Sequence, residues 1–307
     1  MPIRQVEMDD NLRIWRSFSI GSLFDLMMLD TRQYDRSITD LYWNTDYIHA
    51  ISNDAGRTLM GSRQENWFLN QLSASAARGA AWRLIGSQTV FSRVNQSVVY
   101  GNVNPFNYDQ WDGYVGNRNR TLHHLAKNNI GDNIVISGDS HANWVSDLVS
   151  DYSPDGSAGG EYLGVEFAGT AITSPPPAGE PNIPAANIEA DRLSDHNPEL
   201  QWNEMWYRGY FELQIAREEV RALFFGTPSI TTRNSIEIPI ANFTVKKGEN
   251  RLQQPVGGGK VETGSLKGGE RGLGFLANDT ATGEWSVSEH GRQVSLFDLF
   301  LCSLFSC

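Results

Sequence analysis

Residues 133–148 read NIVISGDSHANWVSDL, and this stretch decides the fold. A short apolar run at 134–136 ends abruptly in glycine, aspartate, serine and histidine. Such a run is typical of a strand buried in a parallel sheet. In open α/β sheets, functional groups gather beyond the carboxyl ends of the strands. We therefore expect Asp139 and His141 to lie at the functional edge of an α/β sheet.

The preceding sequence alternates apolar runs with segments of helical period. Ser62 stands three residues before Glu65, the capping-box arrangement that marks the start of a helix. Strand, helix, strand, helix, strand is the rhythm of a sheet with crossover connections, and the fold class is therefore α/β. The predicted strands are 23–29, 81–91 and 133–137, and the predicted helices are 62–77 and 117–128.

Beyond residue 148 the pattern changes to alternating apolar and polar residues. This alternation predicts further strands, with a hairpin near residues 216–219. The proline-rich segment 173–193 is predicted to be a loop. A glycine-rich sequence follows residue 248 and indicates a segment without its own core. We therefore expect a main domain at 1–247 and a poorly structured tail at 248–307.

The composition narrows the possible partners. The 307 residues include 25 basic and 36 acidic side chains, for a net charge of -11. An acidic surface repels phosphate backbones, which argues against nucleic acid as a partner but leaves a small phosphorylated substrate open. No apolar stretch is long enough to span a membrane, and the first residues show no export signal.

Covalent features give weaker indications. The two cysteines, Cys302 and Cys307, lie in the last six residues and cannot form a disulfide framework for the main domain. Four tripeptides fit the glycosylation acceptor pattern and hint at a secreted glycoprotein. They begin at Asn95, Asn119, Asn242 and Asn278.

The GDSH segment, residues 138–141, admits three interpretations. Asp139 and His141 could supply oxygen and nitrogen ligands to a metal ion. Alternatively, Asp139 caps a helix at 142–148 while His141 packs in a turn. A third possibility makes Ser140 a nucleophile, as in the Gly-Asp-Ser esterases, whose Asp-x-x-His lies downstream. Here the only such pattern, residues 46–49, lies upstream, which argues against this interpretation.

Other blocks of the sequence occur together in one known family. They are LDTR (29–32), WRLIGSQTVFSRV (82–94), WDGY (111–114), GDSH (138–141), VEFAGTAITSP (165–175) and RGYFELQI (208–215). In content and order they resemble the PhoD-like alkaline phosphatases, a branch of the metallophosphoesterases. The resemblance covers about residues 3–243.

The resemblance implies a four-layer α/β/β/α sandwich and a centre of two or three metals, associated with calcium and iron. It implies a metal-dependent phosphate ester hydrolase that acts on small monoesters or diesters. Asp139 and His141 match metal ligands of the family. Asp30 and Arg32 match a motif near the mouth of the active site, where the fork of an arginine suits phosphate. The alternative for Asp30 and Arg32 is a buried structural ion pair.

The WDGY block leaves two interpretations open. Trp111 and Asp112 match a family motif near the active site, so a contact of Trp111 or Tyr114 with substrate is one possibility. The alternative for the two rings is packing inside a loop. A similar choice holds for the aromatic residues in 42–47, which either form a substrate wall or pack an Ω-like loop.

The chain also departs from the family pattern. The acidic segments that supply most metal ligands in the family have no match in residues 1–307. We therefore expect a partial fold, the second half of the domain, with an open sheet edge. The second hypothesis follows, in which the chain is an inactive truncated fragment or an interaction module that leaves the metals unbound. The resemblance implies a secreted or cell-surface protein, and the oligomeric state stays open.

Overall fold

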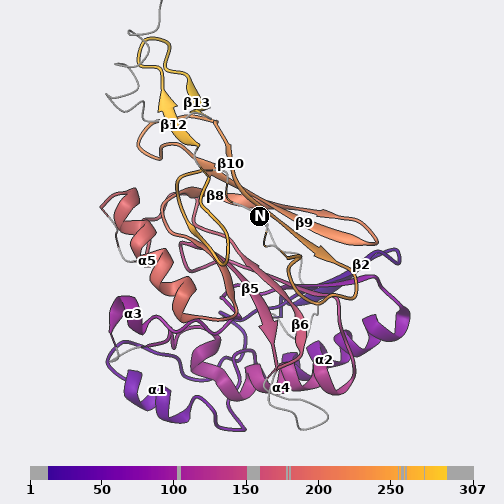
Figure 1. Cartoon of the computed structure of the whole chain (residues 1–307). Coiled ribbons are helices and arrows are strands. Elements are labelled where there is room, and N and C mark those ends of the chain that lie inside the picture. The colour runs from indigo at the N-terminus through magenta and orange to yellow at the C-terminus, as the bar shows by residue number, and fades with distance from the viewer. Residues whose placement is uncertain are drawn as a thin grey trace, which may run out of the picture.

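The computed structural model describes residues 13–101, 105–150, 160–177, 179, 181–254, 256, 259, 261–272 and 274–288 (Figure 1). Two sheets and a group of helices form the structure, and a small hairpin extends beyond them. The helical elements are α1 (Thr45–Ile51), α2 (Gly61–Arg78), α3 (Ser97–Tyr100), the 3-10 turn η1 (Trp111–Tyr114), α4 (Val115–Lys127) and α5 (Ile183–His196). The strands are β1 (Arg16–Ile20), β2 (Phe24–Met28), β3 (Trp82–Gly86), β4 (Asn133–Ser137), β5 (Asn143–Val149), β6 (Tyr162–Ala168), β7 (Leu200–Glu204), β8 (Arg208–Ile215), β9 (Glu219–Thr227), β10 (Ile238–Lys246), β11 (Ser265–Leu266), β12 (Phe275–Asn278) and β13 (Trp285–Ser288).

The large sheet has eight strands in the order β1-β2-β3-β4-β6-β5-β7-β11. Strands β2, β3, β4 and β6 pair in parallel, so their carboxyl ends meet at one edge. Strands β1, β5 and β11 pair antiparallel with their neighbours, which makes the sheet mixed. The predicted α/β class is confirmed, and the predicted strand 133–137 coincides with β4.

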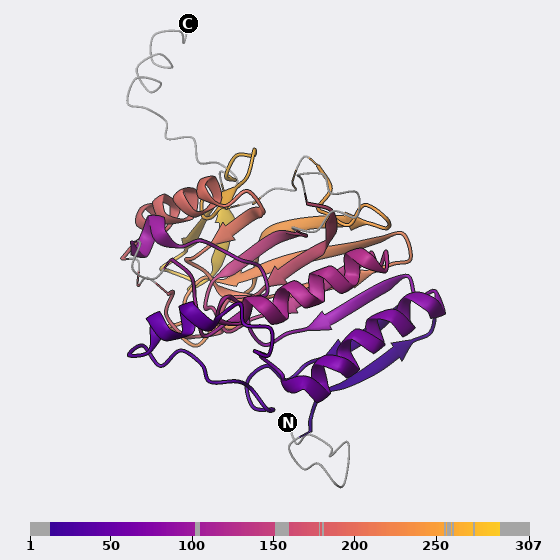
Figure 2. The same cartoon turned by 90° about the horizontal axis from the view of Figure 1, so that it is seen from below.

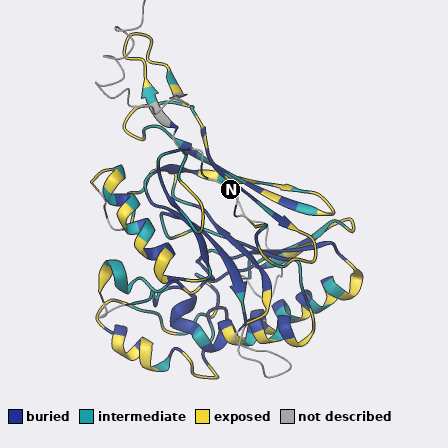
Figure 3. Ribbon diagram, in the orientation of Figure 1, coloured by how far each residue is buried: buried dark blue, intermediate teal, exposed yellow. Residues whose placement is uncertain are grey.

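The small sheet, in the order β10-β9-β8, packs face to face on the large one. Its inward residues alternate with outward ones, as a half-buried strand requires. Phe224 is fully buried at the centre of this core, with its ring centroid 5.0 Å from that of Trp202 and 5.7 Å from that of Phe243. Strands β8 and β9 form the predicted hairpin. Figure 3 shows the strands as mostly buried, with exposed residues at the periphery.

Helices α2 and α4 cover the other face of the large sheet (Figure 2). Both were predicted, at 62–77 and 117–128, because their apolar residues recur at helical spacing. Phe68 and Leu72 of α2 and Leu122 and Leu125 of α4 are buried against Ile85 and the rest of this layer. The described residues form the layers helix, sheet and sheet. The outer face of β8–β10 carries exposed side chains, and the described residues do not supply the fourth layer of the expected sandwich.

Helix α5 corrects the prediction that residues 173–193 form a loop. Proline suggested a loop, but Pro184 stands in the first turn, where its missing N–H costs no hydrogen bond. The Asn182 side chain caps this turn by accepting a hydrogen bond from the backbone N–H of Ala185 at 3.0 Å. Ala190 and Leu193 then bury the inner face of the helix.

The sequence after residue 248 packs partly on the main body. Leu252, Val256 and Val261 are buried in the core between the two sheets. Strand β11 extends the large sheet by pairing with β7, while β12 and β13 form a separate hairpin. Residues 289–307, which the sequence assigns to the tail, lie outside the described residues. The division at residue 247 stays a prediction.

No helix among the described residues has both the length and the apolar character needed to cross a lipid bilayer.

Candidate active site

A cleft of about 640 Å³ opens beyond the carboxyl ends of the parallel strands. It joins the loop after β2, the GDSH turn after β4 and the segment that precedes η1. Arg32, Asp139 and His141, three of the four predicted site residues, line it together. The full lining comprises Arg32, Asp40, Tyr42, Gln96, Tyr100, Phe106, Asn107, Tyr108, Asp109, Asp139, Ser140, His141, Trp144 and Pro177.

The GDSH turn has an unusual backbone. Asp139 and His141 adopt the left-handed region, with φ of 69° and 60°. For residues with a side chain, this conformation costs about 1–3 kcal/mol each and persists only where the surroundings hold it. Strand β5 begins directly afterwards at Asn143, so the helix suggested for 142–148 is wrong. Side chains on both faces of β5 are buried, so the sequence of this strand does not show the alternation of apolar and polar residues that marks a half-buried strand.

The backbone of the turn is held by its neighbours. The carbonyl of His141 accepts hydrogen bonds from Nη1 of Arg208 at 2.6 Å and from the Thr170 hydroxyl at 3.1 Å. Asn143 accepts from the N–H of Thr170 at 3.0 Å and donates to the buried carboxylate of Glu204 at 3.0 Å. These contacts join the ends of β4, β6, β7 and β8, and therefore fix the direction of the turn.

The imidazole of His141 is oriented by one backbone contact. Its Nδ1 lies 3.2 Å from the carbonyl oxygen of Pro175. A carbonyl only accepts hydrogen bonds, so Nδ1 is the donor in this contact, which leaves Nε2 as the ring atom that could bind a metal ion. A backbone carbonyl on the second ring nitrogen is the usual arrangement of metal-binding histidines.

Arg32 connects two carboxylates in the cleft. Its Nη1 donates to Asp109 at 2.7 Å, and its Nη2 lies 3.4 Å from Oδ1 of Asp139. Arg36 holds the other oxygen of Asp109 at 2.7 Å. Burial alone would lower the pKa of Arg32, but the hydrogen bond to Asp109 and the charge of Asp139 outweigh it and raise that pKa. For the acid Asp109 the effects are reversed: burial alone would raise its pKa, but hydrogen bonds from Thr39 and the two arginines lower that pKa.

Asp30 lies beneath the cleft and is almost fully buried, at 2% exposure. Its Oδ1 accepts hydrogen bonds from the backbone N–H groups of Arg32 at 3.2 Å and Gln33 at 2.9 Å. Gln64 of α2 holds both backbone polar groups of Asp30. The alternative of an Asp30–Arg32 ion pair is wrong, because the Arg32 guanidinium pairs with Asp109 and Asp139. Asp30 therefore shapes the turn from which Arg32 projects.

The described residues do not assemble a nucleophilic serine site around Ser140. The Ser140 hydroxyl accepts a hydrogen bond from the indole N–H of Trp144 at 2.6 Å. His49, the base in the upstream Asp-x-x-His pattern, instead packs on Tyr108, with ring centroids 5.3 Å apart. Among the described residues, no hydrogen bond joins Ser140 to His49.

The WDGY block is structural in its contacts. Trp111 is buried and donates to the Ser87 hydroxyl at 3.2 Å. The Tyr114 hydroxyl accepts from Nε of Arg36 at 2.9 Å and donates to the carbonyl of Ser37 at 2.9 Å. These contacts agree with loop packing, the alternative to contact with substrate. Asp112 is also buried, and burial raises its pKa to about 7.

The two adjacent histidines of α4 point in different directions, as neighbouring residues on a helix do. His123 is exposed, whereas His124 is partly buried and its Nε2 lies 2.8 Å from the Ser73 hydroxyl.

A group of cleft residues was not singled out from the sequence. Asp109 lies 77 residues from Arg32, and no local pattern announces such a pair. Tyr100, Phe106 and Tyr108 also line the cleft, although they come from an Asn-rich and aromatic loop without a recognisable motif. Their aromatic density was the only available signal.

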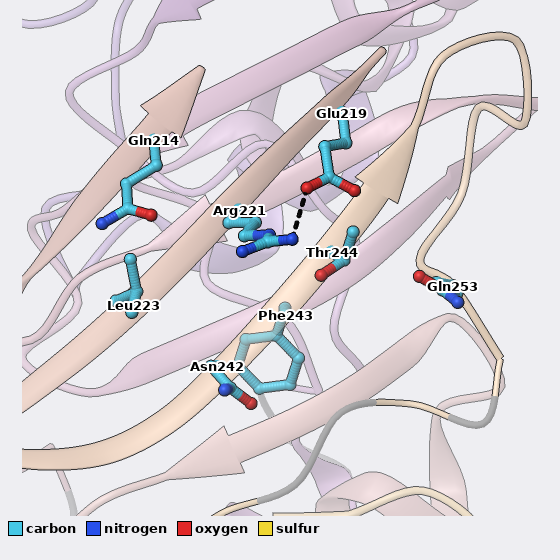
Figure 4. A pocket seen from close by; sticks show the side chains of 8 residues that line it. All are labelled: Gln214, Glu219, Arg221, Leu223, Asn242, Phe243, Thr244 and Gln253. Carbon is cyan, nitrogen blue, oxygen red and sulfur yellow. Dashed lines mark ion pairs between the residues drawn. The ribbon is translucent and has the colours of Figure 1, made fainter. Parts of the chain in front are cut away.

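A second cleft, of about 310 Å³, lies on the small sheet (Figure 4). Its lining includes Gln214, Leu223 and Asn242. The Arg221 guanidinium also lines it and pairs at 2.6 Å with the carboxylate of Glu219, two residues earlier on the same strand, β9. Arg221 is more than half exposed, so its charge is solvated and already paired. This cleft contains none of the predicted site residues.

The chain belongs to the PhoD-like phosphatase family, whose sequence profile matches residues 1–224. Alkaline phosphatase D of Bacillus subtilis (strain 168) is 29% identical over 275 residues, which cover 88% of this chain and 43% of that protein. A solved structure of PhoD superposes with a TM-score of 0.68 at 27% identity, covering 88% of this chain and 48% of that one. A purple acid phosphatase from yellow lupin (Lupinus luteus) seeds gives a TM-score of 0.42 at 10% identity, covering 80% and 35%. The chain thus spans less than half the length of these relatives.

Proposed function

We propose that the chain acts in the metal-dependent hydrolysis of phosphate esters, as a PhoD-like phosphatase of the metallophosphoesterase type. The observation that supports it is the convergence of Arg32, Asp139 and His141 in one cleft at the functional edge of the sheet. Guanidinium, carboxylate and imidazole are the groups that bind a phosphoryl group and a metal ion. Family membership gives independent support.

The residues present fit a metal ion by their chemistry. A carboxylate oxygen from Asp139 suits calcium or iron, and Nε2 of His141 suits iron; calcium and iron are the pair that the resemblance implies. Among the described residues, no three His, Cys, Asp or Glu side chains come together as a metal-binding group. Asp139 and His141 would therefore hold the ion with donors other than those described. Once bound, the metal would polarise the phosphoryl oxygens and activate water.

Arg32 would bind and orient the phosphoryl group. Asp109 and Asp139 already position its guanidinium, so little side-chain freedom is lost when an anion binds. Asp30 would support Arg32 through the turn that it caps. In the hydrolysis itself, the oxygen of water forms a bond to phosphorus and gives up a proton, the phosphorus–oxygen bond to the organic group breaks, and the leaving alkoxide takes up a proton to become the alcohol.

A second candidate is an interaction module of the same fold that does not turn over substrate by itself. It is favoured by the small number of metal donors that the described residues bring together. Two donors would hold a metal weakly and position it poorly. In that case the cleft would bind a phosphate ester without cleaving it.

The test is hydrolysis of 4-nitrophenyl phosphate and bis(4-nitrophenyl) phosphate by the purified chain, with calcium and iron supplied. We expect Asp139→Asn to lower kcat/KM by at least about 100-fold, because it removes a metal donor and a partner of Arg32. Asp195→Asn, the same change at an exposed position on α5, is the matched control. Equilibrium dialysis of both variants with each metal separates loss of metal from loss of turnover.

Three results are informative. Turnover that disappears in Asp139→Asn but persists in Asp195→Asn supports the hydrolase. Turnover that survives Asp139→Asn unchanged shows that the GDSH turn does not hold the metal. Absence of turnover in the unaltered chain refutes the hydrolase for this polypeptide and favours the interaction module.

A further inference from the structure

The cleft has an aromatic side beside its charged end. Tyr42, Tyr100, Phe106 and Tyr108 line it together with Arg32, Asp139 and His141. We call these four residues the aromatic wall. They come from the loop before α1, from α3 and from the segment before η1, so the fold gathers them from separate parts of the chain.

The cleft is larger than a phosphoryl group requires. Its volume of about 640 Å³ lies within the range of small-molecule sites, roughly 300–1,000 Å³. A phosphoryl group at Arg32 and Asp139 would occupy only the charged end. The organic part of the ester would then lie against the remaining lining, where the aromatic wall stands.

Tyr42 is held in a conformation that packing does not explain. Its side chain is 95% exposed, and its φ of 66° lies in the left-handed region. A bulky residue adopts this region at a cost in free energy. Asp40 fixes it by accepting from the N–H of Tyr42 and from the Thr45 hydroxyl, both at 2.8 Å. The loop thus holds an exposed ring at the mouth of the cleft although the ring buries little surface there.

Two deeper members of the wall add to this picture. The Arg93 guanidinium lies 4.2 Å from the centroid of the Phe106 ring, which holds that ring in place by a cation–π contact. Tyr108 is 3% exposed, yet its hydroxyl has no hydrogen-bond partner among the described residues. This hydroxyl oxygen is itself buried, so a ligand in the cleft can meet Tyr108 through its ring but not through its hydroxyl group.

From these observations we propose that the aromatic wall selects phosphate esters whose organic group carries a flat aromatic or heteroaromatic ring. The ring stacks on Tyr42 and its neighbours while the phosphoryl group lies at Arg32. Such stacking tolerates many rings because every one presents a π face. This inference rests on the proposed function for the position of the phosphoryl group.

The test compares adenosine 5′-monophosphate with ribose 5-phosphate. In both, the phosphate is esterified to the primary hydroxyl of ribose, and the heteroaromatic base of the nucleotide takes the place of the anomeric hydroxyl of the sugar phosphate. We expect the nucleotide to bind about tenfold more tightly in calorimetric titration of the unaltered chain. Where the chain turns over ester, the same preference should appear in kcat/KM. Benzyl phosphate against cyclohexylmethyl phosphate repeats the comparison without a sugar and separates flatness from apolar character.

Tyr42→Ala should reduce the preference for the ringed compound by at least about threefold. Tyr47→Ala is the matched control, because Tyr47 is also an exposed tyrosine of this region but does not line the cleft. Equal binding of the two probes by the unaltered chain overturns the inference, as does a preference that both variants retain. A preference that depends on Tyr42 but is not accompanied by turnover supports the ring selectivity of the aromatic wall and refutes only the proposed hydrolase activity.

Discussion

The pH dependence of stability should depend measurably on Asp112. Its side chain is 6% exposed, and its Oδ1 is buried without a hydrogen-bond partner, 3.5 Å from Nε of Arg93. Burial raises the pKa from 3.8 to about 7, although the charges of Arg93 and Arg118 oppose the rise. The folded protein therefore binds this proton more tightly than the unfolded chain does.

The sign and size of the effect follow from linkage. The stabilisation by the protonated carboxyl group is fully present below pH 3.8 and is lost as pH rises to about 7. At 1.36 kcal/mol per unit, the complete loss is at most about 4 kcal/mol. About 2.5 kcal/mol of it should develop between pH 5 and pH 8.

The perturbation is Asp112→Asn, which keeps the shape of the side chain and removes the ionisation. We expect the variant to gain stability over the unaltered chain as pH rises from 5 to 8. Urea unfolding at several pH values measures this difference, and the comparison cancels Asp147, whose pKa burial raises to about 6. Asp195→Asn, at an exposed position, is the control. A difference that stays constant with pH, or one that favours the unaltered chain at pH 8, would refute the reasoning.

Two further changes test the packing. Phe224→Ala should lower the free energy of unfolding by about 3–5 kcal/mol, because it leaves a cavity at the centre of the core between the sheets. Leu223→Ala, on the outer face of the same strand, should lower it much less, and chemical denaturation of both variants measures the difference. Glu166→Ala should lower the free energy of unfolding by at least about 3 kcal/mol, since the carboxylate accepts hydrogen bonds from the hydroxyl of Ser137 and the backbone N–H of Ser92, both at 2.7 Å. Thermal unfolding measures this loss, with Glu161→Ala, at an exposed position, as the control. Equal melting temperatures of the two variants would contradict the prediction.

The sequence predicted those parts of the fold whose signals are local. The run at 134–136 and the helical spacing in α2 and α4 each correspond to an element of the structure. The capping box predicted at Ser62 is wrong, because α2 begins at Gly61 with Met60 as its N-cap and Ser62 lies inside the first turn. Helix α5 was missed because proline was taken as a helix breaker, although Pro184 lies in the first turn, where it is tolerated. Strand β7 was missed because its alternation of apolar and polar residues is confined to the five residues 200–204, too short a run to stand out from the loops around it.

The candidate site shows the same limit. The family motifs led to Arg32, Asp139 and His141, which meet in one cleft. Their partners were not predictable, because the pairing of Arg32 with Asp109 depends on how distant loops fold over the sheet edge. A sequence pattern also cannot show that Asp30 faces inward and holds a turn. Its catalytic role stays a prediction.

The parallel arrangement of β3 and β4 has a practical consequence for handling the protein. The cleft lies past their carboxyl ends, so the turns that precede them lie at the opposite edge of the sheet. Gly79 and Asn128 stand in these turns and are exposed. A biotin or a surface tether attached there would immobilise the protein with its cleft facing the solution. Surface-based binding measurements could then be made without the support obstructing entry of the ligand.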